Sequence, residues 1–212
     1  MIGIISADNL ILKYNTELCN DFSNLIYRTI GMIKKYGLET ESLNMDFKKI
    51  DSNIIESVAE NIAKYREYFE GFMLQKTIEE ILDIISKSNK YIDKIEPWKL
   101  SKEKNNVDTE KSKNIEEDLN IFIYTLINMI NITGILLKPI IPDSARKVFK
   151  SLNFDIDDDK LYNEYQNLIK SLEKNNKQEI FKEMKIMPKY DSKPIFERLT
   201  EEQENRIREI FG

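Results

Sequence analysis

The sequence predicts an all-α protein, an up-and-down bundle of long helices with a few short helices added. Apolar residues recur at helical spacing along several long segments, and no segment shows the sustained alternation that marks a half-buried strand. Only 6 Gly and 5 Pro occur among the 212 residues, which leaves few turn formers for an all-β sandwich. Hydrophobic residues make up 41% of the chain, enough to build a core and too many for general disorder.

The first predicted helix begins near Ser6 or Asp8, either of which can act as its N-cap, and continues to about Tyr36. Gly37 is the expected C′ residue, because glycine readily adopts the left-handed conformation that ends many helices. Residues 38–50 show no helical pattern and are expected to be irregular.

A polar stripe is predicted along this first helix, because Asn20, Asn24 and Arg28 are spaced four residues apart. At about 100° per residue the three side chains drift by only about 80° in total, so they share one face. The core-facing residues of the same stretch lie more than about 100° away, which turns the stripe outward. These core-facing residues are Leu18, Phe22, Leu25, Thr29 and Met32.

Two further long helices are predicted in the next part of the chain. Asp51 is expected to cap a second helix that ends near Phe69, and a third helix extends from about Phe72 to Ile95. Pro97 ends the third helix, since proline lacks an amide donor and the residue before it avoids the α region. The inward positions are Ile54, Ile55, Val58, Ile62 and Tyr65 in the second helix, and Ile78, Ile81, Leu82, Ile85 and Ile92 in the third.

The fourth long helix, over about 117–138, is apolar around most of its circumference and is therefore predicted to form the centre of the bundle. Residues 101–116, which precede it, are charged and are expected to form a mobile loop. Pro139 and Pro142 should bracket a bend after it. A short helix is then expected, capped by Asp143 or Ser144 and carrying Val148, Phe149 and Leu152.

The remainder of the chain is less strongly patterned. The acidic run Asp155–Asp159 is interpreted as a solvated turn, because it lacks the glycine and the closing glutamate of a calcium loop. Residues 160–187 are amphipathic but rich in Lys, Glu and Asn, so a helix is expected and its docking is left open. Thr200-Glu-Glu-Gln-Glu204 has the signature of a helix start and predicts a terminal helix at about 201–211.

These patterns divide the chain into a helix bundle at 1–154, a helical extension at 155–190 and a C-terminal segment at 191–212 that packs back on the bundle. The single cysteine, Cys19, excludes a disulfide framework and fits a reducing compartment. Within a helix it is interpreted as a small buried side chain.

Several functions are excluded by what the chain lacks. It has no histidine, which rules out Ser-His or Cys-His catalysis and any His-ligated metal site, and it has no Gly-rich phosphate loop. We therefore expect no catalytic residue, no metal site and no cofactor in this chain. It contains no run of 18 consecutive apolar residues and no secretory leader, so we expect a cytoplasmic protein without membrane contact.

The net charge of −5 argues against a general nucleic-acid binder, and we expect no DNA contact. A small RNA site remains compatible with this charge. Amides that donate and accept, a guanidinium and an aromatic platform are what reading unstacked bases requires, and Trp98 is the only tryptophan. Taken alone, the stripe would be interpreted as a solvated helix face and Trp98 as a core anchor.

Four segments, in this order, resemble the anticodon-binding helical domain of methionyl-tRNA synthetase, and the resemblance spans roughly residues 8–199. The family usually has Gly where Ser23 stands and Pro where Glu197 stands, and neither departure touches a base-reading position. The four segments are Asn20–Arg28, Asn89–Asp93 with Glu96-Pro-Trp-Lys-Leu100, Leu136–Pro142 and Lys193–Leu199.

The resemblance implies an anticodon-binding site in which Trp98 stacks on a base and the stripe contacts base edges. Asp93 would repel a misplaced backbone or accept from a base amine, and a purely structural cap or salt bridge is equally open for it. The complete set of expected site residues is Asn20, Asn24, Arg28, Asn89, Asp93 and Trp98.

The implied partners are the anticodon loop of methionine tRNA and a class I catalytic domain, either in cis or as a separate chain. ATP and Mg²⁺ would bind in that absent domain, so this chain would not be an enzyme by itself. Two alternatives stay open at this stage. One is the corresponding domain of another class I synthetase, such as the cysteine or leucine enzyme. The other is a helical protein–protein adaptor whose apolar groove binds a partner helix.

Overall fold

The computed structural model describes residues 6–38, 49–154, 157–174, 176–181 and 194–211, and regular structure in these ranges is helical throughout. The predicted all-α fold is therefore confirmed. The elements are α1 (Ala7–Lys13), the π-helix η1 (Tyr14–Ser23), α2 (Asn24–Tyr36), α3 (Ser52–Glu70), α4 (Leu74–Ile95), α5 (Pro97–Lys104), α6 (Thr109–Leu137), α7 (Pro142–Ser151), α8 (Asp158–Glu173), the 3₁₀-helix η3 (Lys177–Ile180) and α9 (Glu201–Phe211).

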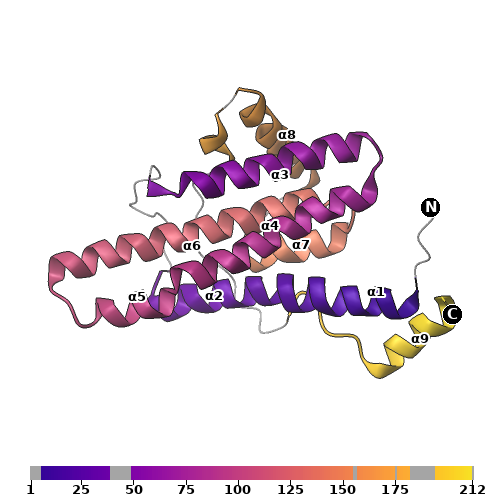
Figure 1. Ribbon diagram of the computed structural model, residues 1–212, viewed down its shortest axis with the longest axis horizontal. Helices are drawn as coiled ribbons and strands as arrows, with labels where there is room; N and C mark the ends of the chain where they lie inside the picture. Colours follow the sequence, from indigo (N-terminus) through magenta and orange to yellow (C-terminus); the bar gives the residue numbers. More distant parts are fainter. Residues whose placement is uncertain (1–5, 39–48, 155–156, 175, 182–193, 212) are drawn as a thin grey trace.

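The long helices run alternately in opposite directions (Figure 1). The continuous helix formed by α1, η1 and α2, called the α1–α2 helix, runs in the same direction as α4, and α3 and α6 run in the opposite direction.

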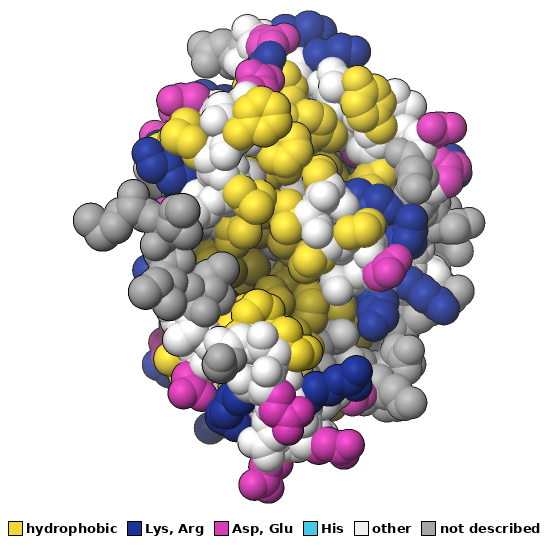
Figure 2. All heavy atoms as spheres, turned by 90° about the vertical axis from the view of Figure 1, so that its right-hand side faces the viewer, with side chains coloured by type: hydrophobic (Ala, Val, Ile, Leu, Met, Phe, Trp, Pro, Cys, Tyr) yellow, Lys and Arg dark blue, Asp and Glu magenta, His cyan; other side chains and the backbone are white. Residues whose placement is uncertain are grey.

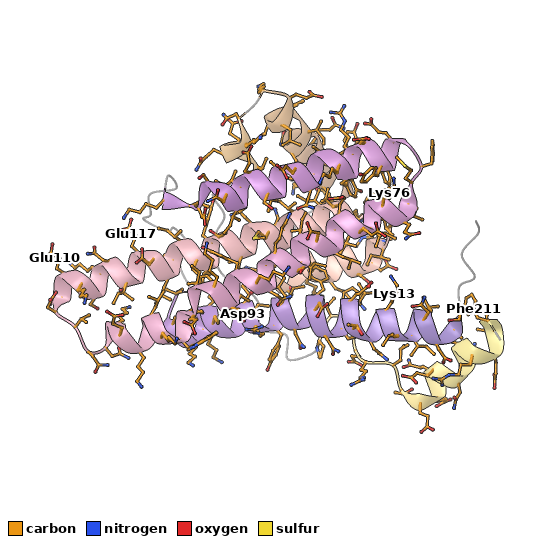
Figure 3. All side chains as sticks on the ribbon, in the orientation of Figure 1. Lys13, Lys76, Asp93, Glu110, Glu117 and Phe211 are labelled. Carbon is orange, nitrogen blue, oxygen red and sulfur yellow. The ribbon has the colours of Figure 1, made fainter. Side chains whose placement is uncertain are left out.

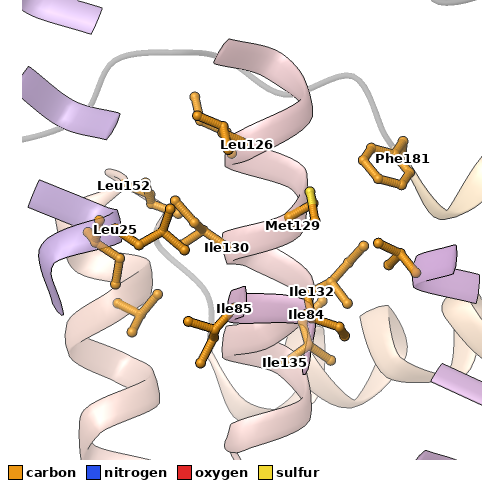
Figure 4. Close-up of a cluster of buried hydrophobic side chains, with 14 of the residues drawn as sticks. Leu25, Ile84, Ile85, Leu126, Met129, Ile130, Ile132, Ile135, Leu152 and Phe181 are labelled. Carbon is orange, nitrogen blue, oxygen red and sulfur yellow. The ribbon is translucent and has the colours of Figure 1, made fainter. Parts of the chain in front are cut away.

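The centre of the bundle is α6, as the sequence predicts. Every residue from Ile121 to Leu137 is buried, and side chains from α2 and α4 meet those of α6 in one apolar cluster (Figure 4). By length and composition α6 could cross a membrane, with a mean hydropathy of 1.6 over 18 residues. However, 94% of that window is buried inside the protein, which is the pattern of a core helix.

The predicted mobile loop at 101–116 is wrong. Helix α5 occupies its first part and α6 begins at Thr109, which leaves only a four-residue connection. Asp108 makes this early start possible, because its carboxylate accepts a hydrogen bond from the backbone amide of Lys111 at 2.9 Å. An ion pair of 2.9 Å between Lys104 and Glu116 also joins α5 to α6. The many charges that suggested a loop are instead paired across two helices.

The predicted cap of the short helix after the bend is also wrong. Helix α7 begins at Pro142, one residue before the expected caps, and Ile141 precedes it without a side-chain hydrogen bond. Proline suits the first helical position because its missing amide hydrogen would have no partner there. Asp143 instead lies in the first turn, where its carboxylate accepts a hydrogen bond from Arg146 at 2.7 Å.

Helix α8 packs on the outside of the bundle against α3 and α6, which answers the open question of docking for this helix, whereas residues 182–187 of the expected helix lie outside the described residues. Tyr165 meets Tyr65 of α3 edge to face, with ring centroids 6.4 Å apart. Asp157 caps α8 by accepting from the amide of Lys160 at 2.8 Å, and Asp155 lies outside the described residues. The division of the chain at residues 154 and 190 stays a prediction.

Candidate nucleic-acid interface

The helix that carries the predicted stripe begins and ends as the sequence predicts. The hydroxyl of Ser6 accepts from the amide of Asn9 at 3.2 Å, and Gly37 ends the helix with φ of 67°. The ten-residue π-helix in its middle was not predicted. Stretches of π-helix are rare and frequently lie at functional sites.

The segment at 194–200 packs against one face of the π-helix, the face that carries small polar side chains. Asn15, Cys19 and Ser23 follow one another at intervals of four and are all buried. The amide of Leu199 donates to the Asn15 side-chain oxygen at 3.1 Å, and the Cys19 thiol donates to the carbonyl of Glu197 at 3.4 Å. The C-terminal segment is thus anchored beside the stripe by contacts across nearly the whole chain.

Sequence reasoning missed Asn15, and one signal could have found it. Asparagine is a poor residue for a helix interior, so its presence there suggests a compensating contact. Ser23, where the family usually has glycine, supplies a comparable contact, because its hydroxyl accepts from the amide of Phe196 at 3.4 Å. Burial raises the pKa of the neighbouring Cys19 thiol, so the thiol stays protonated and able to donate.

The predicted stripe lies on the surface, with Asn20, Asn24 and Arg28 all exposed. The structure brings Asp93 of α4 to it, since the Arg28 Nη2 and Asp93 Oδ1 atoms are 3.7 Å apart. Figure 3 shows Asp93 where α4 passes α2. Two residues 65 positions apart in sequence, both expected at the site, are therefore in contact.

The Arg28–Asp93 pair orients a side chain more than it stabilises the fold. The side chain of Arg28 is 44% exposed and that of Asp93 is 71% exposed, so water screens their attraction. Exposed pairs of this kind contribute about 0–1 kcal/mol. A guanidinium has five N–H donors, so this single contact leaves several of them able to bind a ligand.

Asn89 has a different place from the other expected site residues. Its side-chain nitrogen donates to the backbone carbonyls of Asp21 at 3.2 Å and Ile85 at 3.3 Å. The bond to Asp21 ties α4 to the π-helix, whereas the bond to Ile85 lies within α4. The Asn89–Asp21 and Asp93–Arg28 contacts together fix the two helices side by side in the same direction, which holds the stripe in place.

Trp98 follows a sharp break between α4 and α5. Glu96 has φ of 48°, a left-handed conformation that a non-glycine residue adopts at some cost, and Pro97 is buried at the first position of α5. Trp98 is 43% exposed. It is therefore not the buried core residue that the sequence taken alone would suggest, and it is not fully in solvent either. No hydrogen bond or ring contact joins Trp98 to the stripe within the described part of the chain.

The fold and this surface define a helical domain that presents amide, guanidinium and indole groups to solvent, the groups that contact unstacked bases. A family model described as the anticodon binding domain of methionyl tRNA ligase matches residues 44–212. The chain belongs to this family. This confirms the resemblance and sets aside the domain of the cysteine or leucine enzyme.

Relatives and solved structures agree with this assignment. The methionine–tRNA ligase of Ureaplasma parvum serovar 3 is 30% identical over 204 residues, 95% of this chain and 34% of that protein. That of Lactococcus lactis subsp. lactis is 31% identical over 72% of this chain and 22% of its own length. The free methionyl-tRNA synthetase of Mycobacterium tuberculosis shares the fold, with a TM-score of 0.69 and 18% identity over 92% of this chain and 35% of that one.

Proposed function

We propose that this chain recognises the anticodon of methionine tRNA, with Asn20, Asn24 and Arg28 at base edges and Trp98 as a stacking platform. The Arg28–Asp93 contact carries the proposal, because it holds a guanidinium at the surface for little gain in stability. Membership of the anticodon-binding family supports it. The amides of Asn20 and Asn24 both donate and accept, so they can match the mixed edge of a base.

Asp93 is proposed to act in two ways at this site. Its carboxylate orients Arg28, and its charge disfavours a phosphate in the place of a base. Trp98 would add about 1–3 kcal/mol by stacking on one base. Asn89 is proposed as a positioning residue, because its side-chain nitrogen already donates within the protein.

We further propose that this domain works with a class I catalytic domain, in cis or as a separate chain. The chain spans only 34% and 22% of the length of the two relatives described above. ATP and Mg²⁺ would bind in the catalytic part, in the cytoplasm, and this chain alone should show no methionine-dependent pyrophosphate exchange.

An apolar end of the bundle supports such a partner domain. Hydrophobic side chains gather over the end where α3 turns into α4 (Figure 2). Phe72 is 94% exposed there, and Phe69, Met73 and Leu74 beside it are also exposed. Exposed apolar patches of this kind usually mark an interface.

Binding to an anticodon stem-loop tests the anticodon site. Trp98→Ala should weaken binding by the equivalent of about 1–3 kcal/mol through lost stacking. Asn24→Ala and Arg28→Ala should also reduce discrimination between the methionine anticodon and altered anticodons, since base-edge contacts carry sequence information. Lys35→Ala is the control and should change binding to all stem-loops slightly and equally.

The adaptor alternative makes the opposite prediction. If Trp98→Ala and Asn24→Ala leave affinity and anticodon preference unchanged in folded protein, the anticodon site is wrongly assigned. A Trp98→Ala variant that loses binding to a protein partner alone would then favour the adaptor.

A further inference from the structure

A second candidate site lies beside the stripe. A hollow of about 860 Å³ opens along the η1–α2 helix, where α7 and the segment at 194–203 form its other walls. Three cations line it, Lys147 and Lys150 from α7 and Arg198 from the C-terminal segment. The two lysines are three residues apart on a helix and so point to the same side. We call this feature the basic hollow.

The cations of the basic hollow are available to a ligand. Within the described residues no ion pair joins Lys147, Lys150 or Arg198 to an acidic side chain. By contrast, Arg146 on the same helix is held by Asp143 at 2.7 Å. Glu197 also lines the hollow and offsets part of its charge. Because the whole chain carries a net charge of −5, three cations that have no acidic partner in the described part of the chain are a local feature and not a result of composition.

The basic hollow borders the helix that carries the stripe, although none of Asn20, Asn24 and Arg28 lines it. Tyr27, whose ring is exposed, lines the hollow and directly precedes Arg28. Along this helix the lining extends from Tyr14, at the start of the π-helix, to Ile30 of α2. Ser151 and Thr200 also line it, but their hydroxyl groups already donate, to the Val148 carbonyl at 2.7 Å and to the Gln203 side chain at 3.3 Å. An elongated, open hollow lined by several cations suits a chain of phosphates better than one compact anion.

We propose that the basic hollow binds the sugar–phosphate backbone of the same RNA whose bases meet the stripe. This inference rests on the proposed function. Lys147, Lys150 and Arg198 would each contact a phosphate, which fixes the position of the RNA without reading its sequence. The C-terminal segment, anchored to the π-helix by Asn15 and Cys19, thereby supplies one of the binding cations.

The test is the salt dependence of binding to a methionine tRNA transcript, measured between 50 and 200 mM KCl. The variant combines Lys147→Gln, Lys150→Gln and Arg198→Gln. Each phosphate contact contributes about 0.7–0.9 to the slope of log affinity against log salt, so the slope should become shallower by about 2 or more. The matched control combines Lys64→Gln on α3, Lys170→Gln on α8 and Lys174→Gln directly after α8. It makes the same change in net charge at positions that do not line the hollow.

Two further arms sharpen the test. Glu197→Gln removes the acid that lines the hollow and should tighten binding severalfold at 50 mM KCl. ATP and inorganic phosphate, added at matched ionic strength, should compete no better than KCl. Strong competition by ATP that the triple variant abolishes would mean that the hollow is a nucleotide site, which would overturn the proposal.

The remaining outcomes are distinguishable from a failure of the anticodon site. Asn24→Ala should change anticodon preference and leave the salt slope alone, and the triple variant should do the reverse. If only the triple variant acts, the base-reading site is wrong and the basic hollow stands. If the triple variant and its matched control lower the slope equally, or if the folded chain binds no tRNA, the basic hollow is not a phosphate site.

Discussion

Between Ile121 and Leu137, α6 is buried at every position, whereas the α1–α2 helix keeps Asn20, Asn24 and Arg28 in solvent. The first region is packed by apolar side chains, and each Ile or Leu that is fully buried there contributes roughly 1.5–3 kcal/mol. The second region also packs Phe22, Leu25 and Ile33 into the core, and its outer face is tied to α4 by one screened ion pair and the Asn89–Asp21 hydrogen bond. The buried positions that stabilise the bundle and the exposed groups proposed for recognition are therefore different residues, and mutations should separate the two properties.

The largest effect should come from the centre of α6. Leu126→Ala removes a fully buried side chain and should lower the free energy of unfolding by about 2–5 kcal/mol, measured by urea denaturation. The same change at Leu12, which is exposed on α1, should fall within about 0.5 kcal/mol. Comparable losses at both positions would show that the core extends to α1.

A glycine pair provides a second comparison. A Cβ at Gly134 of α6 would lie 3.0 Å from the ring of Phe149, so Gly134→Ala should cost about 1–3 kcal/mol through overpacking. Gly31 of α2 has open space around it, so Gly31→Ala should stabilise by about 0.5–1 kcal/mol through helix propensity. Thermal unfolding of both variants measures the difference, and stabilisation at Gly134 would contradict the close packing of α6 on α7.

Asp51 should show an intermediate and pH-dependent effect. Burial acts to raise the pKa of its carboxyl, but hydrogen bonds from Asn53 and Lys94 lower it overall. The stabilisation is therefore complete above the ordinary value of about 4 and is lost as the pH falls through the lowered value of the folded state. Asp51→Ala should cost about 0.5–2 kcal/mol at pH 7 and progressively less at pH 3 and below.

The control for this prediction is Asp51→Asn. Asparagine caps a helix as well as aspartate does, so this variant should keep most of the stability at pH 7 without the acid-dependent component. Urea unfolding at several pH values measures both variants. An equal cost of Asp51→Ala at pH 7 and pH 2 would mean that the carboxylate charge contributes nothing.

The smallest change in stability should accompany the loss of the Arg28–Asp93 contact. Asp93→Asn should change the free energy of unfolding by less than about 1 kcal/mol, because the pair is exposed. It should nevertheless weaken anticodon discrimination if Asp93 orients Arg28. Arg28→Gln is the companion variant, and a double-mutant cycle of the two in stem-loop binding measures their coupling. If Asp93→Asn instead lowers the free energy of unfolding by several kcal/mol, the pair is needed for the stability of the fold.

Much of the fold could be predicted because its signals are local. Ser6, Gly37 and Asp51 mark helix ends through their own backbone preferences, and the apolar run of α6 identifies the core without knowledge of any partner. The loop prediction at 101–116 failed for the opposite reason. Charges such as Lys104 and Glu116 look like a solvated linker until the second helix that pairs them is in place.

The sequence by itself determined the helical class, most helix boundaries and the outward direction of the stripe, because helical periodicity depends on neighbouring residues alone. Only the tertiary structure decided that Asp93 contacts Arg28 and that the Asn89 side chain donates a hydrogen bond to the backbone carbonyl of Asp21. It also decided that the C-terminal segment is hydrogen-bonded to Asn15 of the π-helix and that Arg198 lines the same hollow as α7. These contacts join residues far apart in the sequence, and spacing along a chain carries no information about which distant side chains meet.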